Sequence, residues 1–385
     1  MNLKIKNESE VTMKILFMIP ALSYSGAPKM LSWVANQMTE KEHEVSVVSF
    51  FSDIAEHNLN ERVKLHCLNI KQSKKRIIRN TVGMFKTIRA LHKYVKSYNP
   101  DLIVSFLDSV GYVYLGYNKI FGRRKIVVSE RVDPYQYKGF ISKVRFWLMK
   151  KATASVFQTD GAREYFKKYP KIYGNSTVIP NPVFLKEDIQ QNLSNYEVLF
   201  TERDNRIVTV GRLSLKQKRQ DVLIDAFEKV HKIHPELKLV IYGDGESKQS
   251  IEDIIKSKNL EDSVVLAGKT LSVEKEIYNA RAFVLSSDFE GIPNSLIEAL
   301  ALGVPSVATD CSPGGARLLI KDGENGFLVD RGNSNSLAEK LLELVENEET
   351  SNKFSQNAPK IINEFSEEKI ASMWENYFIK TINSK

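Results

Sequence analysis

The chain has 385 residues, of which 42% are hydrophobic and 26% charged, with 19 Gly, 12 Pro and two Cys. This globular composition excludes collagen, low-complexity disorder and a disulfide scaffold, and the length suits two domains. The net charge of +8 is unevenly divided, because residues 1–185 carry 30 Lys and Arg against 14 Asp and Glu, whereas residues 186–385 carry 25 against 33. The basic first half predicts an anionic partner: a nucleic acid, a phosphorylated substrate or a membrane surface.

Cys67 and Cys311 match no metal-ligand spacing and are predicted to be reduced thiols, which favours a cytoplasmic protein. The apolar run at 15–22 has the look of a secretory signal, but Glu8 and Glu10 precede it and Pro20 interrupts it. No stretch reaches the roughly 18 uncharged apolar residues that a spanning helix needs. We therefore expect any membrane association to be peripheral, on the inner face of the cell membrane.

Short runs rich in Val and Ile alternate with longer segments of helical period, which predicts βαβ units around parallel sheets. The predicted strands lie at 14–19, 45–50, 63–68, 102–106 and 126–129, and then at 207–210, 237–242, 264–267, 282–286 and 306–309. Between the two groups, Ile179-Pro180-Asn181-Pro182 holds the chain extended.

The predicted fold class is therefore α/β, with two doubly wound, Rossmann-like domains that face a cleft. The domains are expected at 1–183 and 184–365, and a helix in 366–385 is expected to pack back on the first domain. Because ligands of such sheets bind outside the carboxyl ends of the strands, the loops after the strands are where the chemistry is expected.

Two carboxylates, Glu290 and Glu298, flank the sequence Gly-Ile-Pro-Asn-Ser after the strand at 282–286. Pro293 suits the entry to a helix, and Asn294 or Ser295 suits its cap. A helix that begins there presents free N–H groups and its positive dipole end to a phosphate. Glu298 is then placed to accept hydrogen bonds from a ribose diol, and Glu290 to reach a second sugar; two solvated surface carboxylates are the alternative.

A basic loop follows the strand at 207–210. Gly211 permits a tight turn there, and Arg212 and Lys218 can converge on one diphosphate, the first with a planar fork and the second with a point charge. Such a pattern more commonly indicates a solvated basic loop. Together with the Glu pair in the same domain, however, it becomes a specific indication of a diphosphate site.

At these residues the chain resembles retaining glycosyltransferases of the GT-B fold, family 4, of the bacterial surface-polysaccharide type. The resemblance rests on the Glu-x7-Glu element, on the Gly-Arg-Leu strand end with its downstream Lys, and on the segments at 179–183, 242–245 and 322–329. It implies three catalytic residues, with Arg212 and Lys218 neutralising the donor diphosphate and Glu290 contacting the transferred sugar. Glu298 would hold the nucleotide ribose.

The resemblance also implies donor contacts that are made largely by backbone groups. They are assigned to Gly26, Gly268, Gly291, Ile292, Pro293, Asn294, Ser295 and Leu296. The chain departs from its relatives at two points. Ser25 stands where relatives carry the first Gly of a Gly-Gly pair, and Glu130 stands near the point where many carry a His that contacts the donor sugar. Glu130 is accordingly a candidate sugar or acceptor contact.

Basic residues also gather away from these loops. From Arg62 to Pro100 there are eleven Lys and Arg and no Asp or Glu, above an apolar stripe of helical period, and a second basic segment at 138–151 is interleaved with Phe, Ile, Val and Trp. Packing helices with solvated polar faces explain this one-sided charge poorly. Since each basic residue near an anionic leaflet contributes about 1 kcal/mol, we expect peripheral binding to the anionic inner membrane surface. Nucleic acid is the rival partner, but no nucleic-acid motif accompanies the charge.

No Asp-x-Asp pair and no His-Glu-x-x-His motif occurs in the sequence. Arg212, Lys218 and the helix start are expected to supply the positive charge, so the reaction is predicted to need no metal and no cofactor. The predicted protein is a retaining hexosyltransferase that moves a hexose or N-acetylhexosamine from a nucleotide diphosphate sugar, a UDP-sugar, to a membrane-associated glycan or lipid-linked acceptor. A GT-B-fold nucleotide-sugar epimerase and a non-catalytic binder of membrane or nucleic acid remain as alternatives.

Overall fold

The computed structural model describes residues 12–22, 26–51, 57–70, 83–106, 109–185, 189, 198–270 and 272–384. Contacts between residues divide the chain into two compact units. The first comprises Met1–Ile179 and Glu368–Lys385, and the second comprises Pro180–Glu367. Ser25 and part of the first basic stretch, at 71–82, lie outside the described residues.

The first unit contains a seven-stranded parallel sheet in the order β3-β2-β1-β4-β5-β6-β7. Its strands are β1 (Lys14–Ile19), β2 (Glu44–Ser49), β3 (Lys64–Cys67), β4 (Leu102–Phe106), β5 (Lys125–Ser129), β6 (Ala154–Phe157) and β7 (Ser176–Val178). The strand order reverses at β1, which pairs with β2 on one side and with β4 on the other. This reversal is the topological switch point at which such sheets bind ligands.

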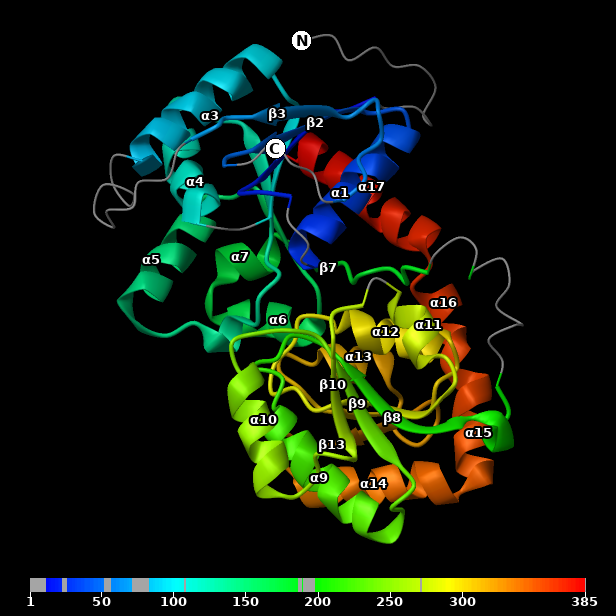
Figure 1. Ribbon diagram of the computed structural model, residues 1–385. Coiled ribbons are helices and arrows are strands. Elements are labelled where there is room, and N and C mark those ends of the chain that lie inside the picture. Colours follow the sequence, from blue (N-terminus) through cyan, green and yellow to red (C-terminus); the bar gives the residue numbers. More distant parts are fainter. Residues whose placement is uncertain are drawn as a thin grey trace. The chain divides into compact units, whose positions relative to one another are not determined.

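The helices of the first unit cover both faces of its sheet. They are α1 (Gly26–Glu40), α3 (Met84–Tyr98), α4 (Ser109–Phe121), α5 (Gly139–Met149), α6 (Asp160–Glu164), α7 (Pro170–Gly174) and α17 (Glu367–Asn383). Figure 1 shows α1 and α17 on one side of the sheet and α3, α4 and α5 on the other. Because both faces are covered, the central strands read as continuous apolar runs in the sequence.

Alternate residues of β1 show how the two faces are filled. Leu16 and Met18 belong to the core that also holds Leu91 of α3, whereas the ring of Phe17 lies 6.3 Å from that of Phe378 on α17. Helix α17 thus packs in the first unit although it is the last helix of the chain.

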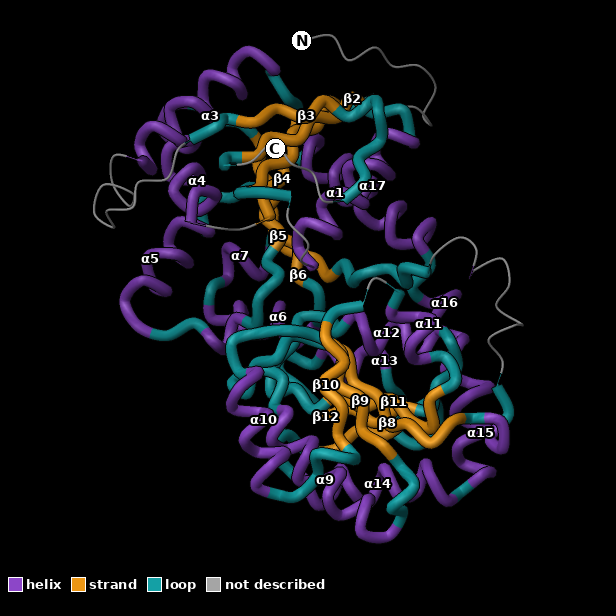
Figure 2. The backbone as a smooth tube through the Cα atoms, viewed as in Figure 1, coloured by secondary structure: helices purple, strands orange, loops and turns teal. Residues whose placement is uncertain are grey.

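The second unit is built in the same way around a six-stranded parallel sheet, in the order β10-β9-β8-β11-β12-β13. Its strands are β8 (Asp204–Val210), β9 (Lys238–Tyr242), β10 (Val264–Gly268), β11 (Ala280–Leu285), β12 (Ser306–Thr309) and β13 (Phe327–Val329). Its switch point lies between β8 and β11, which are adjacent and parallel. Figure 2 shows the helices of this unit packed around the sheet.

The helices of the second unit complete its two layers. They are α9 (Gln220–Ile233), α10 (Lys248–Ser257), α11 (Val273–Ile277), α12 (Asn294–Ala301), α13 (Gly315–Leu319), α14 (Ser334–Glu346), α15 (Glu348–Asn357) and α16 (Ile361–Glu364). None of the described helices in either unit is long and apolar enough to cross a membrane.

Each of the ten strands predicted from the sequence overlaps an observed strand, and the predicted α/β class with two Rossmann-like sheets is confirmed. Three strands were missed: β6, β7 and β13. They have four, three and three residues. Runs of three or four residues carry little periodicity, although β3 and β12, which also have four residues, were predicted.

Substitution of Trp374 tests how much α17 contributes to the stability of the first unit. Its side chain is fully buried, and its ring stacks at 6.1 Å on that of Phe106 at the end of β4. We expect Trp374→Ala to lower the free energy of unfolding by about 3–5 kcal/mol, because the substitution leaves a large cavity. Urea denaturation followed by circular dichroism measures this loss. The control Asn376→Ala, at an exposed position of the same helix, should change stability by less than about 0.5 kcal/mol.

Candidate functional site

The candidate site of the second unit lies on the loops that follow β8 and β11. Because these strands are parallel neighbours, their carboxyl ends meet at the switch point of the sheet. The two loops are joined directly there. Ser286 Oγ donates to the carbonyl oxygen of Lys218 at 2.7 Å, the Asp288 N–H donates to that of Gln217 at 2.8 Å, and Gln217 Nε2 donates to that of Phe289 at 3.2 Å. The structure thus brings together the two motifs that the sequence marked separately.

An ion pair between Lys218 and Glu290 lies at the centre of this junction. Lys218 Nζ is 2.6 Å from Glu290 Oε1, and the side chains are only 16% and 11% exposed. Ser287 Oγ donates to the same carboxylate oxygen at 2.9 Å. The sequence indicated both charged residues but neither their pairing nor the role of Ser287, which has no distinguishing signal in the sequence. The Glu290 carboxylate is therefore held from two directions at the carboxyl edge of the sheet.

Arg212 stands on the same loop, but its side chain is exposed. Its main chain is fixed by Gln220, whose Nε2 donates to the Arg212 carbonyl oxygen at 2.8 Å. A second ion pair holds the far end of the loop, since Arg219 Nη1 is 3.1 Å from Asp288 Oδ2. The loop backbone is thus fixed at both ends, while the Arg212 guanidinium faces solvent.

The backbones of neighbouring loops approach each other closely here, and this requires glycine. Gly243, after β9, has φ +141°, and a Cβ at this position would lie 1.8 Å from the carbonyl oxygen of Gly211. A Cβ on Gly211 would in turn lie 3.0 Å from Lys218 Cε. The Lys218 side chain therefore lies across the bare face of Gly211, which positions its ammonium group toward Glu290.

Helix α12 begins at Asn294, with Pro293 as its N-cap residue and no side-chain cap. The expectation that Asn294 or Ser295 caps the helix is wrong. Asn294 Oδ1 instead accepts from Asn181 Nδ2 at 2.8 Å, and Ser295 Oγ donates to the carbonyl oxygen of Val210 at 3.0 Å. Both side chains are used to tie the helix start to other segments, so the positive end of the helix is left to backbone groups.

The remaining predicted donor residues lie on α12, on the loop before it and at the end of β10. The side chains of Ile292 and Leu296 are buried in the core, so only their backbone groups can face a ligand. Glu298 lies one turn into α12 and is also buried. Gly268 ends β10 with φ +75°, and its carbonyl oxygen accepts the Gly243 N–H at 2.7 Å. Gly291 lies on the loop between Glu290 and the helix, where its carbonyl would be 2.2 Å from a Cβ on Gly315.

In the first unit, Gly26 is the first residue of α1. Glu130 follows β5 and is buried, with Tyr112 Oη donating to its Oε2 at 2.7 Å and Tyr137 Oη to its Oε1 at 3.0 Å. Burial raises the pKa of the Glu130 carboxyl, and the two tyrosine hydrogen bonds oppose this shift. Both carboxylate oxygens are thus engaged inside the unit. This geometry favours a structural role for Glu130 over the sugar or acceptor contact that the sequence suggested.

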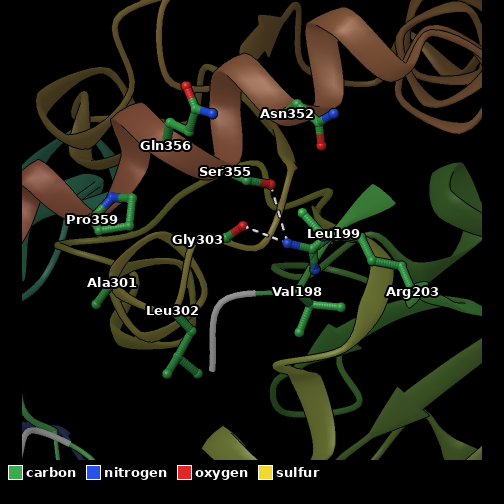
Figure 3. A pocket seen from close by; sticks show the side chains of 10 residues that line it. All are labelled: Val198, Leu199, Arg203, Ala301, Leu302, Gly303, Asn352, Ser355, Gln356 and Pro359. Carbon is green, nitrogen blue, oxygen red and sulfur yellow. Dashed lines mark hydrogen bonds between the residues drawn. The ribbon is translucent and has the colours of Figure 1, made fainter. Parts of the chain in front are cut away.

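The second unit also has a cavity of about 390 Å³, which is lined by Val198, Leu199, Arg203, Ala301, Leu302, Gly303, Asn352, Ser355, Gln356 and Pro359. Figure 3 shows Arg203 at its edge, where the guanidinium donates to Gly303 O and Ser355 Oγ. Arg203 immediately precedes β8 and Gly303 precedes β12, so this cavity lies at the amino edge of the sheet. It contains none of the predicted site residues.

The fold defines the class of the protein: an α/β protein of the GT-B glycosyltransferase type, with two Rossmann-like parallel sheets. The family model for glycosyl transferases group 1 matches residues 191–361, and the model for Glycosyltransferase Family 4 matches residues 24–187.

Individual proteins agree with these models. An uncharacterized glycosyltransferase of Methanocaldococcus jannaschii is 30% identical over 306 residues, which cover 74% of each chain. An α-1,4-N-acetyl-D-galactosaminyltransferase of Campylobacter jejuni, named for a glycan substrate on undecaprenol diphosphate, is 28% identical over 94% of this chain and 97% of its own. The structure of HepE from Anabaena with UDP and glucose superimposes with a TM-score of 0.74 at 20% identity, covering 94% of this chain and 98% of that one. The chain belongs to the glycosyltransferases.

Substitution of Gly243 tests the close approach of the loops that follow β8 and β9. We expect Gly243→Ala to destabilise the second unit by at least about 2 kcal/mol, since the added Cβ meets the Gly211 carbonyl and the positive φ disfavours any other residue. Thermal unfolding measures the effect. Gly174→Ala is the matched control, because a Cβ there meets nothing within 4 Å. Equal melting temperatures for the two variants would contradict the close approach.

Proposed function

We propose that the protein is a retaining glycosyltransferase that transfers a hexose or N-acetylhexosamine from a UDP-sugar to a membrane-associated glycan or a lipid-linked acceptor in surface-polysaccharide biosynthesis. The observation that carries this proposal is the convergence of Lys218, Glu290 and the start of α12 at the carboxyl edge of the second sheet, beside Arg212 on the same loop. A nucleotide diphosphate and a sugar are the ligands that such a combination of cations, carboxylate and helix start suits.

The charges of the site match the needs of the reaction. As the bond between the anomeric carbon and the diphosphate oxygen breaks, negative charge grows on the departing UDP. Arg212, Lys218 and the backbone N–H groups at the start of α12 are preorganised donors that stabilise this charge. The acceptor hydroxyl attacks on the face from which UDP leaves, and its proton passes to a departing phosphate oxygen, so the anomeric configuration is retained.

Glu290 has two states in this proposal. Without donor its carboxylate binds Lys218 and Ser287. When the diphosphate takes Lys218 as its counter-ion, the carboxylate becomes available to the hydroxyl groups of the transferred sugar. Glu298, one turn into α12, is assigned to the ribose of the nucleotide. Ser287 then acts as a positioning residue, because it holds Glu290 at the edge of the loop.

The choice of donor and acceptor is supported by proteins similar to this chain. HepE was crystallised with UDP and glucose. The Campylobacter relative is named for transfer to a glycan on undecaprenol diphosphate, and another relative, from Erwinia amylovora, is named for amylovoran biosynthesis. A lipid-linked acceptor places the reaction at a membrane, and we propose a peripheral location at the cytoplasmic face of the cell membrane.

Substitution of the two cations tests the diphosphate assignment. We expect Arg212→Ala and Lys218→Ala each to lower kcat by about 10²- to 10³-fold, because each removes a preorganised charge from the leaving group. UDP release in the presence of donor and a short lipid-linked acceptor measures the rate, and circular dichroism checks folding. Lys216→Ala is the control, since Lys216 is an exposed cation of the same loop. Near-normal turnover in Arg212→Ala would contradict the assignment.

Metal independence forms a second test. Because protein cations and a helix start supply the positive charge at the diphosphate, we expect turnover to stay within about twofold when EDTA is added and when Mg²⁺ or Mn²⁺ is restored. The same assay without acceptor should give little UDP and no altered nucleotide sugar. Strict dependence on Mn²⁺ would overturn the metal-free mechanism, and conversion of the donor sugar without acceptor would indicate an epimerase.

A further inference from the structure

Helix α5 is apolar on its outer face as well as on its inner face. Phe140, Ile141 and Trp147 are 77%, 78% and 57% exposed, and the i, i+4, i+7 spacing places Phe140, Val144 and Trp147 on one side of the helix. The opposite side buries Ser142, Phe146 and Met149 in the unit. A surface helix is normally polar on its outer side, and a large exposed apolar patch marks an interaction site.

The neighbouring helices α3 and α4 also carry exposed apolar side chains. Ile120 and Phe121 at the end of α4 are 68% and 64% exposed, and Phe85 at the start of α3 is 66% exposed. Helix α4 packs against both neighbours, since a Cβ on Gly116 would lie 3.0 Å from Leu148 of α5 and the ring of Tyr117 is 5.0 Å from that of His92 on α3. Figure 1 shows the three helices together on one side of the sheet.

The charge between these apolar side chains has one sign. Helices α3, α4 and α5 contain no Asp or Glu. Their exposed cations, with one from the segment before α5, are Lys86, Arg89, Lys93, Lys96, Lys119, Lys138 and Lys143. Lys151 Nζ lies over the Trp147 ring, 4.0 Å from its centroid. A cation and an exposed apolar ring are therefore in contact on this surface. A lipid bilayer with anionic headgroups matches this arrangement, because its headgroups pair with the cations while its acyl region takes the apolar side chains.

We propose that the outer faces of α3, α4 and α5 form a docking surface for an anionic lipid bilayer, with Phe140, Ile141 and Trp147 inserted below the headgroups. This rests on the proposed function and names the partner that holds the acceptor. Helix α5 starts at Gly139, in the segment that follows the carboxyl end of β5. Insertion of its first turn therefore brings the carboxyl edge of the first sheet, where α1 also begins, close to the leaflet that carries a lipid-linked acceptor.

Tryptophan fluorescence tests this proposal directly. Trp33 and Trp374 are buried, whereas Trp147 is exposed, so a blue shift on adding vesicles reports Trp147 entering an apolar environment. We expect the shift, and quenching by brominated acyl chains, with vesicles of equal parts phosphatidylglycerol and phosphatidylcholine at low salt. Vesicles of phosphatidylcholine alone should bind at least tenfold more weakly. No shift and no sedimentation with the anionic vesicles would overturn the proposal.

Matched variants separate the apolar and the charged parts of the surface. Phe140→Ser with Ile141→Ser should weaken vesicle binding by about tenfold or more. Lys138→Ala with Lys143→Ala should weaken it by about fivefold per charge and reduce the preference for anionic lipid. Ile233→Ser and Lys256→Ala change an exposed apolar and an exposed basic residue of the second unit, and they should bind vesicles as the unchanged protein does.

The alternatives give different results with the same proteins. If Phe140→Ser with Ile141→Ser converted a dimer to a monomer in light scattering while the unchanged protein ignored vesicles, the surface would pair two copies of the chain and the proposal would be wrong. Tighter binding of duplex DNA than of anionic vesicles would also overturn it. A separate assay tests the proposed function. Donor turnover with a water-soluble acceptor needs no vesicle, and we expect it to be unchanged in the Phe140→Ser, Ile141→Ser variant.

Discussion

The arrangement of the candidate donor site depends on how a parallel sheet brings two distant loops together. Lys218 and Glu290 are far apart in the chain, and they meet only because β8 and β11 are adjacent and parallel, so that both loops leave the same edge. The Lys218 side chain passes over the bare backbone of Gly211, and Gly243 lets the next loop come close to it. One topological constraint thus fixes a cation, a carboxylate and the backbone between them.

The ion pair also sets a condition for binding. Removing one partner of a largely buried pair is costly because the other charge is left uncompensated. A ligand that separates Lys218 from Glu290 must therefore satisfy both groups, the ammonium with an anion and the carboxylate with hydrogen-bond donors. A molecule that carries a phosphate and sugar hydroxyl groups a few ångströms apart can meet both requirements at once. This condition agrees with the sugar nucleotide that we propose as the donor.

The sequence predicted the repeated parallel architecture well because buried strands such as β1, β4 and β9 are short runs of apolar residues between helical segments. It could not predict side-chain partners that depend on strand order. Asn294 and Ser295 have the composition of helix caps, yet both bond to other segments, because tertiary contacts outweigh a local preference of about 1 kcal/mol. Glu130 was marked by its place near the point where many relatives carry a His, but Tyr112 and Tyr137, which donate hydrogen bonds to it, lie on other segments of the first unit.

Those same tyrosines also contact α5. The Arg145 guanidinium of α5 lies 4.8 Å from the ring of Tyr112 and 4.4 Å from that of Tyr137, and both hydroxyls bond to Glu130. The inner side of α5 is thereby fixed to the carboxyl end of β5, while its outer side carries Phe140 and Trp147. In the proposed docking, contacts that already hold the helix in place reduce the conformational freedom that binding would cost. The orientation that α5 adopts on a surface is then also the orientation of the sheet edge beneath it, because the Glu130 network connects the two.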